Sequence, residues 1–361
     1  MGTNILRTPA RTPVPLQHGP ADVQTAATTR QIPNTVKRMV FLWRPQIIAG
    51  AGYRYPAHLS YFHALAVACA LTMLPGCALV KRRAVGMVAS TLASSGDVFT
   101  RDDDLELVGQ AIPFGLKLYE SLLESAPKNK DLLIATCSNF TQYGLAYLET
   151  EALELGEARH HDEVAHLNAR ALKLYLRARG YCLRAMEVRF PGIGPNLLAD
   201  PARALTAARK SDVPLLYWTA ASWGSAIGLG VDKPELVIDM PVVRALADRA
   251  LALDSSWGNG TLHEMFISLE SLPEALGGSP ARAREHFARA IELEGGRSPG
   301  PYVALAVGIA MPAQDRTEFE SLLKKALAID PEQNPHKRLI TLVQQRRARA
   351  LLDHIDTMFT K

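Results

Sequence analysis

The stretch RAIELEGG (residues 289–296) ends an amphipathic segment and recurs in altered form as RALALDSS (residues 249–256) and KALAIDPE (residues 325–332). The alanine that the three stretches share is, in chain order, Ala250, Ala290 and Ala326. These alanines recur at an interval close to the roughly 34-residue helix–turn–helix period of tetratricopeptide arrays. The spacing predicts a tetratricopeptide-like helical-repeat array of antiparallel helix pairs.

The segments before these repeats also carry apolar residues three and four positions apart. One stripe comprises Leu105, Val108, Ile112, Leu116, Tyr119 and Leu123. A second stripe comprises Leu133, Cys137, Phe140, Gly144 and Tyr147. This period is typical of amphipathic helices, whereas a half-buried strand alternates at every second residue. Residues 78–361 are therefore predicted to form one all-α domain.

The charge of the chain is unevenly distributed. The 361 residues carry a formal net charge of +4, but seven of the 40 Lys and Arg residues precede Cys77. Only one of the 36 acidic residues, Asp22, lies in that segment. The rest of the chain is slightly acidic and offers no basic field, which excludes nucleic acid as an expected partner.

An apolar run, residues 64–74, leads into the tetrapeptide LPGC at residues 74–77. The run is too short to span a bilayer comfortably but suits the hydrophobic region of a secretory signal. LPGC resembles the bacterial lipobox, in which the cysteine thiol accepts the lipid. We predict a disordered or mis-started leader over residues 1–57, a signal region with lipobox over residues 58–77, and lipidation of Cys77. An ordinary buried thiol at the end of an uncleaved helix is the alternative.

Three consecutive aspartates, Asp102, Asp103 and Asp104, precede the first apolar stripe. Clustered carboxylates need a cation or N–H donors to offset their repulsion. Asp103 and Glu106 have the spacing of a capping box, so Asp103 is predicted to be the N-cap of a helix. The other two aspartates then lie near the positive end of the helix dipole. The D-x-D-x-D spacing of a calcium loop is missing, so we predict no metal here.

Motifs with catalytic potential fail on their spacing. His161 and His166 are five residues apart and diverge around a helix, unlike the histidines of the H-E-x-x-H zinc motif. SWGSAIG (residues 222–228) misplaces the first glycine of a nucleophile elbow. Ser279 and Pro280 fit the N-cap and first position of a helix rather than a phosphate loop. We expect no catalytic residues, no metal and no cofactor.

Two cysteines follow Cys77, namely Cys137 and Cys182. In an oxidising compartment such a pair can form a disulfide. Each cysteine lies in an apolar helical pattern, however, so we favour buried free thiols and keep pairing as the alternative.

Four blocks of the sequence resemble, in order, the T-component of tripartite ATP-independent periplasmic (TRAP) transporters. They begin SSGDVFTRDDDLELV (residues 94–123), LLIATCSNFTQYGLA (residues 132–152), VPLLYWTAASWGSAI (residues 213–229) and KRLITLVQQRRARAL (residues 337–359). The resemblance covers nearly everything after Cys77. It implies a periplasmic lipoprotein of cryptic tetratricopeptide-type helix pairs, a homotrimer that docks the periplasmic solute-binding component, and a hydrophobic channel in each protomer. The family is not established as catalytic.

Aromatic side chains gather beside small residues in two of these blocks, with an asparagine and a glutamine among them. An apolar site with a few polar groups is typical of small-molecule binding. The candidates for a ligand path are Asn139, Phe140, Gln142, Tyr143, Tyr147, Tyr217, Trp218 and Trp223. The alternative is that each of them is an ordinary core residue.

Two functions fit these observations. The first is a lipid-anchored periplasmic accessory subunit of a TRAP-type uptake system, which binds a solute-binding protein and a hydrophobic or amphipathic small molecule. The second is a helical-repeat scaffold lipoprotein for envelope assembly without transport. Ala78, rather than aspartate, follows Cys77 and favours the outer membrane by analogy with known sorting signals.

Overall fold

The computed structural model describes residues 96–359, and every regular element in that range is a helix. The all-α prediction is therefore confirmed for this part of the chain. The predicted leader (residues 1–57), the predicted signal and lipobox segment (residues 58–77) and Cys77 lie outside the described residues. No helix within residues 96–359 combines the length and the apolar composition that crossing a bilayer requires.

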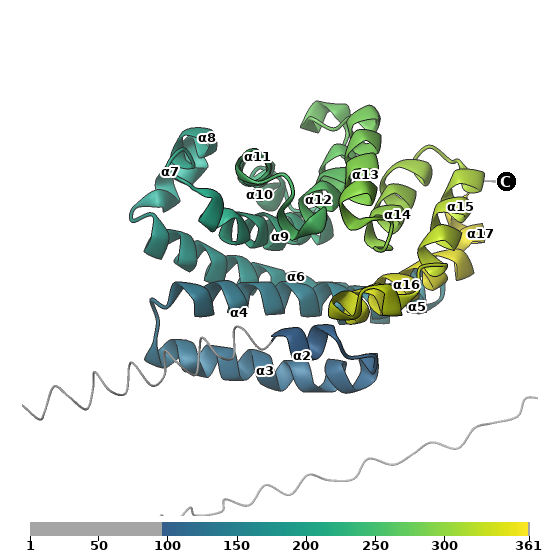
Figure 1. The fold of residues 1–361 in the computed structure, drawn as a ribbon, viewed down its shortest axis with the longest axis horizontal. Helices are drawn as coiled ribbons and strands as arrows, with labels where there is room; N and C mark the ends of the chain where they lie inside the picture. The colour runs from purple at the N-terminus through teal and green to yellow at the C-terminus, as the bar shows by residue number, and fades with distance from the viewer. Residues whose placement is uncertain (1–95, 360–361) are drawn as a thin grey trace, which may run out of the picture. The chain divides into compact units, whose positions relative to one another are not determined.

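Four long helices run side by side and form one layer of the fold (Figure 1). They are α3 (Leu105–Ser125), α4 (Lys130–Tyr143), α6 (Glu157–Arg189) and α9 (Val213–Leu229). Each helix packs on the next in this order. The predicted stripe of α3 explains its packing, because Val108, Leu116, Tyr119 and Leu123 are all buried.

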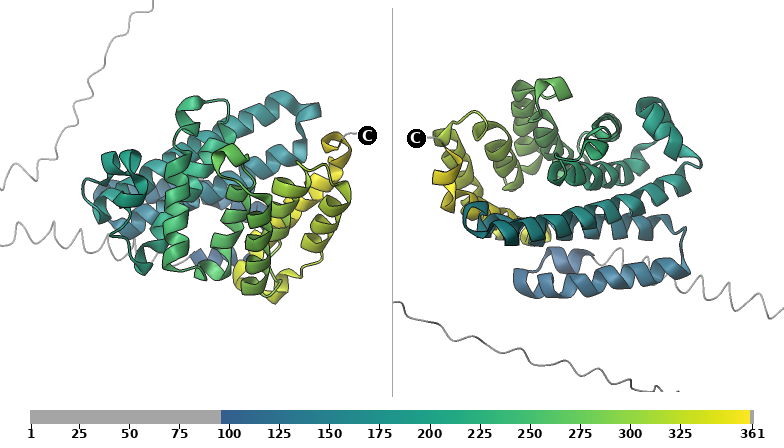
Figure 2. Two further views of the ribbon diagram at one scale, coloured as in Figure 1. Left: turned by 90° about the horizontal axis from the view of Figure 1, so that it is seen from above. Right: turned by 180° about the vertical axis from the view of Figure 1, so that it is seen from behind.

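Further helices continue the array from α9 and curve away from it (Figures 1 and 2). They are α11 (Met240–Leu253), α12 (Thr261–Glu270), α13 (Pro280–Glu294), α14 (Gly300–Leu305), α15 (Arg316–Leu327) and α16 (Arg338–Asp353). The remaining α-helices are α2 (Gly96–Thr100), α5 (Thr150–Leu155), α7 (Ile193–Ala199), α8 (Pro201–Ala204), α10 (Pro234–Val237) and α17 (Ile355–Met358).

The three repeated stretches end α11, α13 and α15, and their shared alanines are fully buried. Close packing around Ala290 explains why small residues are needed there. Gly260, at φ 102°, comes so close that a Cβ on it would lie 3.1 Å from the Ala290 carbonyl oxygen. Small residues at these places let neighbouring helices approach, which confirms the helical-repeat array. The closer likeness to tetratricopeptide repeats stays a prediction.

The array closes on itself, because α16 packs on α5 and also contacts α2 and α3. Arg346 of α16 donates to both carboxylate oxygens of Glu154 in α5, at 2.8 and 2.6 Å. This paired geometry is the strongest form of a guanidinium–carboxylate contact. The last long helix is therefore fastened to the first helices of the described chain. The sequence repeats did not predict this closure.

Within residues 96–359, two segments are π-helical, with backbone hydrogen bonds that span five residues. The segment η1 (Gly144–Glu149) joins α4 to α5, and η5 (Ala306–Ala310) follows α14. At η1, Gly144 lies against Tyr175 of α6, and a Cβ on it would be 2.7 Å from the Tyr175 ring. The Tyr175 hydroxyl in turn donates to the Glu149 carboxylate. Gly144 is thus required by close packing.

The N-cap of α3 lies one residue after the predicted position. Asp104, not Asp103, is the N-cap, and its carboxylate accepts from the Leu107 amide at 2.9 Å. The Asp102 carboxylate accepts from the Asp104 amide, also at 2.9 Å, whereas Asp103 is exposed. Consecutive aspartates offer equivalent acceptors, so spacing alone could not choose among them. The predicted cap at Ser279 with Pro280 in the first helical position is confirmed.

Candidate functional site

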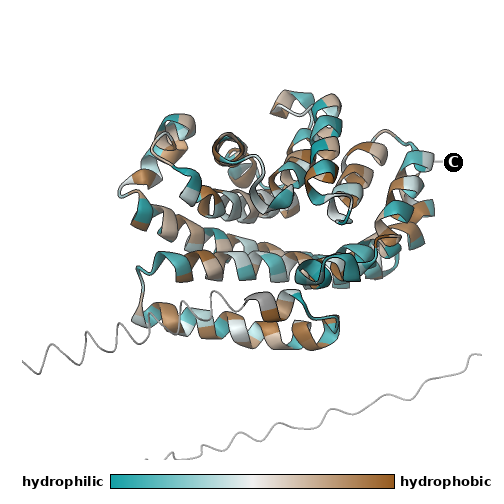
Figure 3. Cartoon of the chain, viewed as in Figure 1, coloured by the Kyte–Doolittle hydropathy of each residue, from teal (hydrophilic) through white to brown (hydrophobic). Residues whose placement is uncertain are grey.

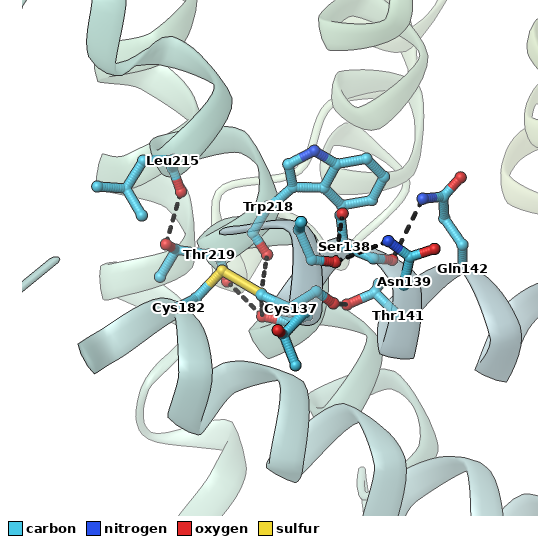
Figure 4. Close-up of a disulfide and its surroundings, with 12 residues drawn as sticks. Cys137, Ser138, Asn139, Thr141, Gln142, Cys182, Leu215, Trp218 and Thr219 are labelled. Carbon is cyan, nitrogen blue, oxygen red and sulfur yellow. Dashed lines mark hydrogen bonds between the residues drawn. A yellow bond between two sulfur atoms is a disulfide. The ribbon is translucent and has the colours of Figure 1, made fainter. Parts of the chain in front are cut away.

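A disulfide joins Cys137 of α4 to Cys182 of α6, two neighbouring helices of the long-helix layer (Figure 4). The preference for buried free thiols was wrong. Both residues are fully buried, as the apolar pattern predicted, but their Cα atoms are 5.5 Å apart, within the range that a disulfide bridges. That spacing depends on the register between α4 and α6, which the sequence does not reveal. The Cys137 sulfur also lies 3.7 Å from the Trp218 carbonyl oxygen of α9.

The polar candidates on α4 are directed back to their own helix. The Asn139 side-chain amide donates to the Ala135 carbonyl oxygen at 2.8 Å. The Gln142 amide donates to the Ser138 carbonyl oxygen at 3.3 Å, and Gln142 is exposed (Figure 4). A hydrogen bond of this kind satisfies the amide locally and leaves less of it for a ligand.

The aromatic candidates on α4 and η1 differ in burial. Phe140 is 2% exposed and packs beside the disulfide. Tyr143 and Tyr147 are half-buried and stacked, with ring centroids 5.3 Å apart. The Tyr147 hydroxyl is buried without a hydrogen-bond partner among the described residues, and burial raises the pKa of Tyr147 to about 12. Tyr147 is therefore a neutral phenol whose hydroxyl donor is unused, and its ring is one member of the stacked pair.

The three candidates on α9 have different surroundings. Trp218 packs against the same cluster as Phe140 and Tyr143, so the structure brings these three predicted residues together around the disulfide. Trp223 is 3% exposed, and the Arg179 guanidinium lies 5.0 Å from its ring centroid. Tyr217 makes an edge contact with Trp218, with centroids 4.9 Å apart.

Tyr217 also packs against Trp257, with ring centroids 4.7 Å apart. Trp257 precedes α12, and sequence reasoning did not single it out. Both rings are half-buried. Burial and the negative charge of Glu264 raise the pKa of Tyr217, which keeps the phenol neutral. The predicted candidates thus divide into a group around the disulfide and a second group around Tyr217.

Glu264 of α12 is the functional candidate that sequence reasoning missed. It is half-buried. Burial raises its pKa to about 7, against an opposing effect from Lys337 and a reinforcing one from Glu294. The sequence feature that could have indicated it is a glutamate within the largely apolar stretch TLHEMFISLE. Buried residues precede and follow it in α12.

No three His, Cys, Asp or Glu side chains within residues 96–359 are grouped so as to hold a metal ion. His161 and His166 are both exposed on α6. A different histidine pair is in contact: the buried His263 of α12 and the half-buried His286 of α13 share a hydrogen bond of 2.9 Å between their Nδ1 atoms. Burial and the neighbouring His286 lower the pKa of His263 to about 4. This pair connects α12 to α13.

Comparison with known proteins agrees with the sequence resemblance. A family model described as TRAP transporter T-component matches residues 101–359. An uncharacterized protein of Treponema pallidum (strain Nichols) is 30% identical over 306 residues, which cover 79% of this chain and 93% of that protein. The residues matched by the family model include the long-helix layer, both cysteines of the disulfide and Glu264 of this chain.

Proposed function

The chain belongs to the TRAP transporter T-component family, and from this premise we propose that it is a lipid-anchored periplasmic subunit that binds a solute-binding protein and a hydrophobic or amphipathic small molecule. The family is one of transporter accessory subunits that act on the periplasmic side. The anchor at Cys77, the outer membrane, the homotrimer and the solute-binding partner belong to the proposal.

The proposal that the protein binds a small molecule rests on half-buried aromatic rings on neighbouring helices. Tyr143 and Trp218 share one cluster, and Tyr217 continues from Trp218 to Trp257. Aromatic rings that are only partly covered by their own protein retain apolar surface for a ligand. Phe140 and Trp223 are covered almost completely, so the proposed path runs along the half-buried members.

A protein partner is supported by apolar side chains on the outer face of α3. Leu107 and Phe114 are 57% and 75% exposed, and Leu118 continues the same side one turn later. Figure 3 shows α3 as the outermost helix of the layer, with apolar residues along it. A helix that is apolar on two sides needs a second surface to cover one of them. We propose that this face takes part in docking another protein.

The test uses the full-length protein expressed with its natural leader. We expect co-purification of a periplasmic solute-binding protein, and we expect uptake of that protein's solute to fall when the gene is deleted. Phe114→Glu should weaken the partner contact without unfolding the chain, with Val231→Glu as the matched control at another exposed apolar residue (71% exposed). Unchanged uptake in the deletion strain would favour the scaffold function instead.

The anchor has its own test. Cys77→Ser should abolish both labelling by a radioactive or clickable fatty acid and release of the signal segment. Persistent lipid labelling of the Cys77→Ser protein would contradict the lipobox interpretation, since no other residue of that motif carries a thiol.

A further inference from the structure

A cavity of about 460 Å³ lies between α3 and α6, and more cationic than anionic side chains line it. Arg177, Tyr181 and Arg184 contribute from α6 at positions i, i+4 and i+7, which share one face of a helix. Lys117 and Glu120 contribute from α3. The volume is in the range of small-molecule sites, so the cavity has room for a ligand next to these charges.

The Glu120 carboxylate in the cavity wall already accepts three donors. Lys117 Nζ and the Tyr181 hydroxyl each donate to it at 2.6 Å, and the Arg177 guanidinium pairs with it. Burial alone would raise the pKa of Glu120, but the hydrogen bonds from Lys117 and Tyr181 and the charge of Arg177 outweigh it and lower the pKa. The ionised Glu120 side chain is only 10% exposed. It therefore holds Lys117 and Arg177 in place at the cavity.

Arg184 is held at the same cavity by neutral groups. Its Nη2 donates to the Pro127 carbonyl oxygen at 3.1 Å, and its guanidinium lies 5.5 Å from the centroid of the Tyr181 ring. These contacts position the guanidinium without offsetting its charge. Arg184 is exposed, so its other N–H groups are accessible to a ligand.

The Tyr181 ring connects the cavity to the aromatic residues around the disulfide. It lies 5.8 Å from the Phe140 ring, centroid to centroid, and packs on the same cluster as Tyr143 and Trp218. The Arg177 guanidinium lies 5.3 Å from the Phe140 ring centroid. A cationic cavity thus adjoins the aromatic residues proposed to contact the apolar part of a ligand.

We propose that this cavity binds the singly charged oxyanion group of an amphipathic molecule through Lys117, Arg177 and Arg184. A guanidinium binds two oxygens of a carboxylate or a phosphodiester in a forked geometry, and an ammonium group adds a point charge. These three cations face two acids in the cavity wall, Glu120 and Glu124, and the excess of one positive charge suits a monoanion. The assignment deepens the proposed function, on which it rests for its physiological meaning, by giving the charge of the small molecule.

The test compares two anions with a neutral molecule. Octanoate carries a carboxylate, dihexanoylphosphatidylglycerol carries a phosphodiester, and octanol carries no charge. Both anions are used below their micellar concentrations, and binding to the purified full-length protein is measured by calorimetry near neutral pH. We expect an anion to bind more tightly than octanol. Which of the two anions binds more tightly identifies the source of the oxyanion, a free acid or a lipid headgroup.

Two substitutions in the cavity wall should change the affinity for that anion in opposite directions. Arg184→Gln should weaken binding roughly tenfold, because a charge-assisted contact is lost. Glu124→Gln removes an exposed negative charge from the same wall and should strengthen binding. Arg170→Gln, at an exposed arginine about two turns before Arg177 in α6, is the matched control and should leave the affinity unchanged. Circular dichroism of all three variants should match that of the wild type.

Equal affinity of the anion for the wild type and Arg184→Gln would overturn the site. Failure of both anions to bind would do the same, as would octanol binding as tightly as they do. These measurements involve no protein partner. Any of these results would leave co-purification of a solute-binding protein untouched, which separates failure of the site from failure of the proposed function.

Discussion

Arg338 donates from Nη1 to the carbonyl oxygen of Arg101 at 3.0 Å, which joins two residues 237 positions apart in the chain. The Arg101 side chain donates a second hydrogen bond across the same junction, from Nε to His336 Nδ1 at 3.1 Å. These bonds lie where α16 meets the segment between α2 and α3. They show that the closure of the array is specific and does not depend on apolar packing alone.

Arg338→Ala should loosen this closure. We expect a loss of about 1 kcal/mol in the free energy of unfolding, because a hydrogen bond from a charged donor and its ion pair with Glu332 are removed. Hydrogen exchange should become faster in α2 and in the first turn of α3. Arg316→Ala, which removes an ion pair with Asp356 near the other end of the described chain, is the control and should leave α2 unaffected.

Asp104→Ala should destabilise the protein by about 1 kcal/mol, since the Leu107 amide loses its acceptor. Asp103→Ala removes the same charge one residue earlier and should have almost no effect, because Asp103 does not cap the helix. Urea unfolding of the two variants checks the assignment. If Asp103→Ala lowered the free energy of unfolding more than Asp104→Ala, the N-cap would be Asp103, as the sequence predicts.

The Cys137→Ser and Cys182→Ser double variant should unfold at a temperature roughly 10 °C lower than the wild type. The disulfide closes a loop between residues 45 positions apart, which in the chain-entropy account stabilises by about 4 kcal/mol. Intact mass measurement of the wild type should be lower by two hydrogen atoms than the reduced chain. Alkylation of Cys137 and Cys182, located by peptide mapping of protein unfolded without reductant, would contradict the bond.

The His263–His286 pair should make the protein less stable in mild acid. The pKa of His263 is lowered to about 4, so between that value and its ordinary 6.5 the unfolded chain binds a proton that the folded chain does not. The free energy of unfolding should thus fall as the pH is lowered through this window. His263→Asn should flatten the fall, whereas His161→Asn, at an exposed histidine, should not.

Much of the fold could be predicted from periodicity, because burial and helical spacing are local properties of a sequence. The stripe through Val108 and Leu116 and the caps near Ser279 are of this kind. The disulfide, the closure through Arg338 and the cavity between α3 and α6 depend on which helices meet and in what register. Glu264 and Trp257 were overlooked for this reason, since their significance comes from neighbours far along the chain.

The π-helical segment η1 has a consequence for how the length of this chain can vary. One π turn holds about one residue more than an α turn, so it absorbs an insertion while the helix on either side keeps its facing. Deleting one residue between Gly144 and Glu149 would therefore turn η1 into ordinary α-helix and leave Glu154 directed at Arg346. The same deletion inside α6 would rotate everything beyond it by about 100° and misalign the disulfide. Single-residue gaps between relatives are accordingly expected at η1 and η5, and not within α6.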